Sequence, residues 1–202
     1  EKLETIAIAD DEPTPSIRAP QVEPRRGPAL RCIDLAIGYP ERRIGADIGE
    51  VELHMQPFEL NPAMPAEGVD AAQYMAGKYG LSAEQLAANR ARLVERGAAE
   101  GFAFGERTHI WNTFDAHRLL FWAGKEGPAG SQRALKHALL AAYHGQGRNP
   151  GAHDVLLELA EQAGLPAERV CEVLARGELT QEVGEAEGIW QDMDINSLPA
   201  VI

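Results

Sequence analysis

Cysteine is scarce in this chain of 202 residues, and its scarcity limits the chemistry that the protein can perform. The two cysteines, Cys32 and Cys171, lie far apart, and neither belongs to a Cys-x-x-Cys pair. A scaffold held together by disulfides and a zinc site built from thiolates are therefore excluded. Apolar neighbours along the chain predict that both thiols are buried as small hydrophobic groups, and the default compartment is the reducing cytoplasm.

Positive charge and long apolar runs are also in short supply. The chain has 19 Lys and Arg against 31 Asp and Glu, for a formal net charge of −12. An acidic surface repels phosphates, so we expect neither nucleic acid nor an anionic membrane as a partner. A run of about 18 apolar residues is missing, which predicts no membrane span. The first residues do not have the pattern of a signal peptide.

The six histidines show no metal-binding pattern. His137 and His144 are seven residues apart. No pair has the i, i+4 spacing, with a catalytic glutamate, that helical zinc proteases use. We therefore expect no metal site.

The first part of the chain predicts strands separated by an irregular segment. Residues 5–9, "TIAIA", are β-branched and apolar, which is typical of a buried strand. The prolines of residues 13–28 prevent any long regular element. Residues 29–38 fit a short helix or a strand equally well. Residues 50–58 alternate apolar and polar side chains, which predicts a half-buried strand.

From residue 69 onward the apolar spacing becomes helical. Gly80 is a plausible helix end, and Ser82 with Gln85 has the spacing of a capping box. The predicted helices span 69–80, 82–101, 112–127, 131–147, 153–164 and 166–177. The acidic run "GEAEG" that follows, residues 184–188, reads as solvated surface, and "LPAVI" at the end of the sequence predicts a strand.

Three stretches resemble a known family. They are "PFELNPAMPAEG" (57–68), "NTFDAHRLL" (112–120) and "AYHGQGRNPGAHDVLLELAEQAGL" (142–165), and they look like the FrnE-type branch of the DsbA family. The resemblance implies an α/β, thioredoxin-like fold with a large inserted all-helical subdomain. Residues 1–60 would form the first part of the thioredoxin-like domain, 61–188 the helical insertion, and 189–202 the cis-proline loop and the returning strand.

The same resemblance implies a Cys-Pro-x-Cys motif after the first strand, where a helix N-terminus stabilises a thiolate. One alignment, after residues 5–9, puts the motif on Thr14-Pro15-Ser16-Ile17. A second alignment, with residues 31–38 as the strand, puts it on Tyr39-Pro40-Glu41-Arg42. We prefer the first because it leaves room for a helix before the next strand. Neither segment contains a cysteine.

Three functions follow from the resemblance. The first is a member without its dithiol that binds a small molecule or a peptide in the groove by the cis-proline loop. The second is an enzyme like the hydroxychromene-carboxylate isomerases and kappa-class glutathione transferases, with glutathione as cofactor and an aromatic, polyketide-type substrate. Its candidate catalytic residues are Thr14 and Ser16. The third is a thiol–disulfide oxidoreductase by family similarity.

The resemblance also indicates which residues would line the groove. The candidate substrate-binding residues are Asn112, Thr113, His117, Leu198 and Pro199. Asp115 and Arg118, on the helix that carries His117, are expected to tie that helix to its surroundings. The final predicted strand would have an unpaired edge, so a homodimer is a further expectation.

Overall fold

The protein is described by a computed structural model, which covers residues 30–33, 53–195, 197–198 and 200–201. The predicted strand at 5–9, the proline-rich segment 13–28 and both candidate motif segments, 14–17 and 39–42, lie outside the described residues. The elements are, in chain order, β1 (Leu30–Ile33), β2 (Leu53–Gln56), β3 (Val69–Asp70), α1 (Ala71–Tyr79), α2 (Ala83–Ala99), β4 (His109–Ile110), α3 (Phe114–Glu126), α4 (Ser131–Leu140), the π-helix η1 (Ala141–Gly145), α5 (His153–Gln162), α6 (Ala167–Ala175), α7 (Thr180–Asp192) and β5 (Ala200–Val201).

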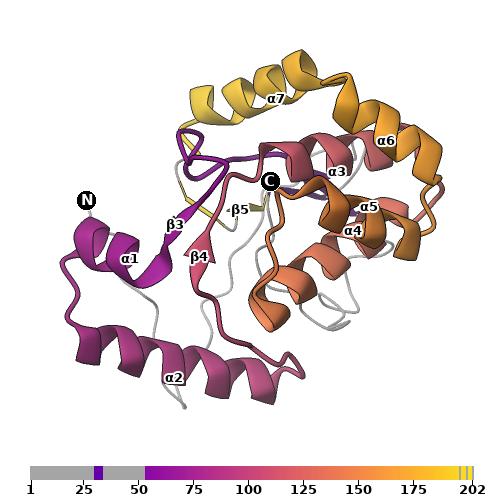
Figure 1. The fold of residues 1–202 in the computed structure, drawn as a ribbon. Helices are drawn as coiled ribbons and strands as arrows, with labels where there is room; N and C mark the ends of the chain where they lie inside the picture. Colours follow the sequence, from indigo (N-terminus) through magenta and orange to yellow (C-terminus); the bar gives the residue numbers. More distant parts are fainter. Residues whose placement is uncertain (1–29, 34–52, 196, 199, 202) are drawn as a thin grey trace, which may run out of the picture.

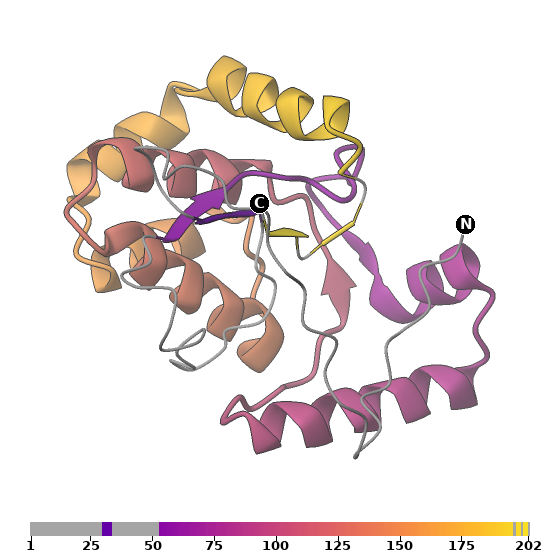
Figure 2. The same cartoon turned by 180° about the vertical axis from the view of Figure 1, so that it is seen from behind.

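Strands from the two ends of the chain meet in one mixed sheet of order β2-β1-β5. The central strand β1 pairs with β2 in parallel and with β5 antiparallel. The strands predicted within 50–58 and at the end of the sequence are therefore confirmed, and the ambiguous segment 29–38 is a strand in its described part. Figures 1 and 2 show this sheet beside the helical block. The expected α/β fold with a helical subdomain is thus confirmed.

Local capping explains where the first two helices begin and end. Helix α1 ends at Gly80, whose φ of 64° lies in the left-handed region that favours glycine. The predicted capping box of α2 is present. The Gln85 amide N–H donates to Ser82 Oγ (3.3 Å), and the Ser82 amide N–H donates to Gln85 Oε1 (2.8 Å). These bonds satisfy amide groups that the first turn of a helix leaves unpaired.

Three parts of the helical region differ from the sequence prediction. The helix predicted over 131–147 ends at Leu140 and continues as η1. The acidic run read as solvated surface belongs to helix α7, whose buried residues are Val183, Glu187 and Trp190. Only two of those three are apolar, so the periodic signal was weak. The two-residue strands β3 and β4, which pair antiparallel, are too short to produce a pattern.

Cys171 is exposed on α6, contrary to the prediction that it is buried. The buried residues of this helix are Val170, Val173 and Leu174. Successive helical side chains point about 100° apart, so an apolar neighbour in sequence does not bury the residue next to it. The side chain of Cys32 lies outside the described residues.

The main core lies between helices α3 to α6, with α3 also packed on β2 and α7. Its fully buried members include Leu119, Leu135, Leu156, Val170 and Val173. Because protein cores are closely packed, truncating any of these fully buried side chains should leave a cavity.

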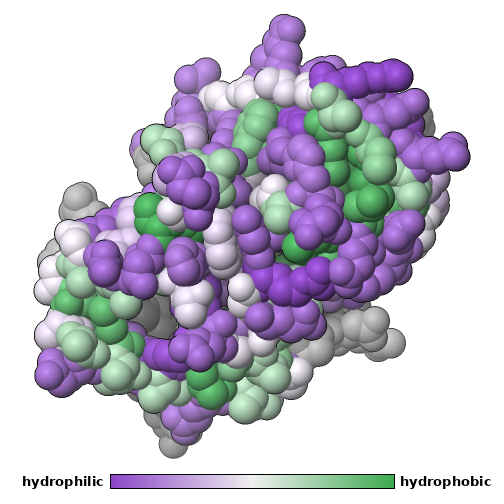
Figure 3. Space-filling view, viewed as in Figure 1, coloured by the Kyte–Doolittle hydropathy of each residue, from purple (hydrophilic) through white to green (hydrophobic). Residues whose placement is uncertain are grey.

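Helices α1 and α2 form an arm that stands away from this core (Figures 1 and 2). Arg90 Nη2 on α2 donates to the Gly105 carbonyl (2.7 Å), and Gly97 lies against the ring of Phe104. Hydrophobic side chains are exposed on the arm, among them Leu93 and Val94. Figure 3 shows green, hydrophobic patches over this part of the molecule, at lower left. No helix in the described ranges is long and apolar enough to cross a bilayer.

Leu119→Ala should destabilise the protein by about 2–5 kcal/mol, because it leaves a cavity in the packed core. Urea denaturation gives the free energy of unfolding. Leu93→Ala is the matched control, since that leucine is 42% exposed, and its effect should stay within about 0.5 kcal/mol. Equal losses in the two variants would contradict the assignment of this core.

Candidate functional site

The candidate site lies at one edge of the sheet, where β1 meets both of its neighbours. Ile33 is paired with Gln56 of β2 and with Ala200 of β5, so the carboxyl ends of the parallel strands meet the start of the antiparallel one. In open α/β sheets, ligands bind outside the carboxyl ends of the strands. Phe58, which follows β2, packs there with Trp190 near the end of α7 and with Ala200 of β5.

Asn112 ties the start of α3 to the loop that follows β2. Its Nδ2 donates to the Met64 carbonyl (3.0 Å), and its Oδ1 accepts from the Phe114 amide N–H (2.9 Å). Both polar atoms of this candidate binding residue are thus engaged within the protein. Thr113 is the N-cap of α3, is half-buried, and makes no side-chain capping bond.

His117 lies one turn further along α3 and is buried. Its backbone amide bonds to the Thr113 carbonyl as part of the helix (3.0 Å), and its side chain also interacts within the protein. The ring therefore lies among protein groups and not on an open face. Its role in binding remains a prediction.

Leu198 belongs to a small apolar group at the sheet edge, which we call the edge cluster. It is formed by the buried Phe58 and Trp190, against which Ile195, Leu198 and Ala200 pack. Pro199, Thr14 and Ser16 lie outside the described residues. Of the predicted site residues, the structure therefore brings Leu198 to the edge cluster and leaves Asn112, Thr113 and His117 at the start of α3.

Trp190 is a member of this edge that the sequence analysis did not identify. Two residues beyond the end of α7, Asp194 has a positive φ of 61°. The Ile195 amide N–H then donates a hydrogen bond back to the Trp190 carbonyl (3.1 Å). This 6→1 bond, with the accompanying contact between Ile195 and Trp190, is the Schellman arrangement of a helix end. In the sequence, the one feature that pointed to Trp190 was its position shortly before Leu198-Pro199.

Arg118 is the buried cation beneath the first turn of α3. Its Nε and Nη2 donate to Asp115 Oδ1 (3.1 and 2.7 Å), and its Nη1 donates to the carbonyls of Val173 and Glu178 (both 2.8 Å). The guanidinium thereby joins α3 to the end of α6 and to the turn before α7. The expectation that Asp115 and Arg118 tie the helix to its surroundings is confirmed.

The second oxygen of Asp115 faces His153, the first residue of α5. The distance between Asp115 Oδ2 and His153 Nε2 is 2.6 Å. Burial acts to raise the pKa of Asp115, but the hydrogen bonds from His153 and Arg118 outweigh it and lower the pKa below its usual value.

Glu59, three residues beyond β2, has the opposite shift. Burial raises the pKa of its carboxyl group, and the negative charge of Asp115 raises it further. Two carboxyl groups near one edge thus have their pKa values pushed apart. Within the described ranges, no group of three or more His, Cys, Asp or Glu side chains is placed to hold a metal ion.

Glu59→Gln should change the pH dependence of stability. Because the pKa of Glu59 is raised on folding, its ionisation disfavours the folded state as pH rises above about 4.5. The stability of the variant relative to wild type should therefore increase between pH 4 and pH 7, measured by urea denaturation. Glu161→Gln, at an exposed glutamate of α5, is the matched surface variant against which the profile is compared. A flat profile for Glu59→Gln would contradict the assigned environment.

Asp115→Asn should have the opposite pH dependence and a larger effect. The variant leaves the charge of buried Arg118 uncompensated, for a loss of about 3–5 kcal/mol near pH 7. Since the pKa of Asp115 is lowered on folding, this contribution is present above about pH 4 and disappears as pH falls through the folded-state pKa. Thermal denaturation across this pH range measures it, and a difference that persists unchanged in acid would contradict the ion pair.

Comparisons with known proteins agree with this geometry. The family model described as DSBA-like thioredoxin domain matches residues 41–202. A crystal structure from Streptomyces coelicolor, described as a probable DsbA oxidoreductase, superposes with a TM-score of 0.69 at 32% sequence identity. The match covers 75% of this chain and 65% of that one, so it spans less than two thirds of the solved protein. No curated protein matches.

Thus the mixed sheet, the helical block beside it and the match over residues 41–202 lead to one conclusion: the chain belongs to the DSBA-like thioredoxin domain family.

Proposed function

We propose that this protein binds a small molecule or an extended peptide in the groove beside Leu198 and Pro199, and that it does not carry out dithiol–disulfide exchange. The observation that carries the proposal is the placement of its cysteines. An exchange cycle needs two thiols close together. The region matched by the family contains Cys171 alone, and this residue is an exposed, free thiol on α6.

The position of the former redox motif bears on where a ligand would bind. The segment Tyr39–Arg42 lies in the connection between the parallel strands β1 and β2, and the family match begins within it, at residue 41. Thr14 and Ser16 precede β1 and the matched region. These observations favour the second alignment over the one preferred from sequence alone. Thr14 and Ser16 remain candidate residues for the glutathione-dependent alternative.

The edge cluster supports a binding role because it presents apolar side chains at the carboxyl ends of the parallel strands. Phe58 and Trp190 are buried there, while Leu198 is half-buried and borders them. Apolar walls with a few polar groups are typical of small-molecule sites.

A fragment screen tests the binding role. We expect neutral aromatic fragments detected by ligand-observed NMR to lose binding in Leu198→Arg, which puts a charge on the groove wall. Leu93→Arg, at an exposed leucine of the distant arm, is the matched control and should keep the same fragments. If the fragments bind both variants alike, the groove is not the site.

Thiol assays test the rest of the proposal. The protein should not reduce insulin, and Cys171→Ser should behave like wild type because no second thiol completes a cycle. Insulin turnover that depends on Cys171 would overturn the loss of exchange. Calorimetric binding of glutathione that is abolished by Thr14→Ala or Ser16→Ala would instead favour the transferase-like alternative.

A further inference from the structure

The indole N–H of Trp190 is a buried donor that has no acceptor within the described part of the chain. The residue is 5% exposed, and its Nε1 has no hydrogen-bond partner among the residues that the structure describes. An unsatisfied buried donor costs about 1–3 kcal/mol, and buried tryptophans usually find a partner.

Trp122 shows the usual arrangement in the same protein. It is 2% exposed, and its Nε1 donates to Glu126 Oε2 at 2.9 Å. The indole of α3 is thus satisfied, whereas that of α7, at the edge where a ligand is proposed to bind, meets no acceptor from residues 30–33, 53–195, 197–198 or 200–201.

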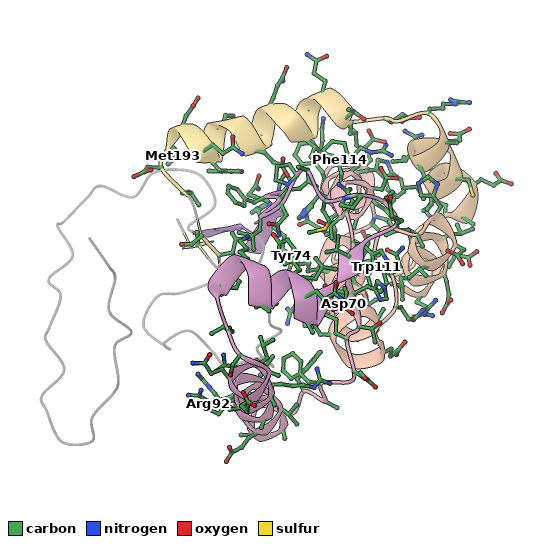
Figure 4. The ribbon with its side chains drawn as sticks, turned by 60° about the vertical axis from the view of Figure 1, so that its left-hand side comes forward. Asp70, Tyr74, Arg92, Trp111, Phe114 and Met193 are labelled. Carbon is green, nitrogen blue, oxygen red and sulfur yellow. The ribbon has the colours of Figure 1, made fainter. Side chains whose placement is uncertain are left out.

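The residues that pack around Trp190 are apolar, and two of its neighbours along α7 are exposed. Phe58 and Leu198 pack around it in the edge cluster, and on α7 itself Ile189 and Met193 are 56% and 53% exposed. Figure 4 shows Met193 at the end of α7, with Phe114 beneath the same helix. Methionine adapts to varied shapes, so the exposed Ile189 and Met193 would suit contact with an apolar ligand of irregular outline.

Charge near the edge cluster selects against an anion. Residues 57–77 and 177–202 contain no lysine or arginine, whereas Glu59, Glu187 and Asp192 add negative charge to these segments. A carboxylate or phosphate would be repelled by these side chains, and neither segment offers it a cation. The acceptor that fits the Trp190 N–H is therefore a neutral oxygen.

We propose that Trp190 Nε1 donates a hydrogen bond to the neutral carbonyl oxygen of a small apolar ligand that packs against Phe58 and Leu198. This inference rests on the proposed function and makes it more specific. The ligand would be an apolar ketone or amide, and Trp190 would be the side chain that selects for the carbonyl oxygen of that ligand. The donor that lacks a partner among the described residues gains one in the complex.

Benzophenone and diphenylmethane test this inference, because the two molecules have the same rings and only the first has a carbonyl group. Titration of ¹⁵N-labelled protein should shift the Trp190 indole proton downfield with benzophenone and not with diphenylmethane. Trp190→Phe keeps an aromatic ring and removes the donor. It should weaken benzophenone binding about three- to tenfold and leave diphenylmethane binding unchanged. Trp122→Phe is the matched control and should affect neither ligand.

The results of these experiments distinguish failure of the Trp190 donor role from failure of the proposed binding function. If benzophenone binds at the edge cluster with no downfield shift and with equal affinity for Trp190→Phe, the donor role is overturned and the groove remains a binding site. If an uncharged apolar peptide shifts the Trp190 indole and benzophenone does not, the ligand class is wrong. If neither small molecule perturbs Phe58, Trp190 or Leu198, both the inference and the small-molecule form of the proposed function are overturned.

Discussion

The buried guanidinium of Arg118 is the interaction on which the arrangement of the helices depends. It accepts no hydrogen bonds and must donate all of its own, so the helix that carries it has to lie where oxygens are available. Those oxygens come from Asp115 on the same helix and from the carbonyls at the end of α6 and before α7. Since a carbonyl at a helix end has no partner within the helix, one cation stabilises three elements at once.

The same network extends to the proposed binding edge. Asp115, fixed on one side by Arg118, presents its other oxygen to His153 at the start of α5 and raises the pKa of Glu59 beyond β2. The edge cluster is a separate, apolar group, in which Trp190 is held by the helix end at Asp194 and Ile195. The proposed binding role rests on this cluster, since its members come from the loop after β2, the end of α7 and β5.

Sequence reasoning succeeded where the signal is local. The capping box at Ser82, the helix end at Gly80 and the strand around Leu53–Gln56 depend on neighbouring residues, and each is present. It failed where tertiary packing decides. Helix α7 has too few apolar residues to be recognised, and Cys171 was judged from its neighbours in sequence although the helix turns it to solvent. The choice between the two motif alignments stays a prediction, because both segments lie outside the described residues.

The sequence by itself determined the fold class, the family resemblance and the absence of any Cys-x-x-Cys pair, because these depend on residue type and spacing. Only the tertiary structure decided which residues share the sheet edge, because strand pairing and helix packing join segments that are far apart in the chain. It also separated two tryptophans that look alike in sequence. Trp122 has Glu126 one turn away as its acceptor, while Trp190 is buried at a helix end where no acceptor reaches it in the described part of the chain.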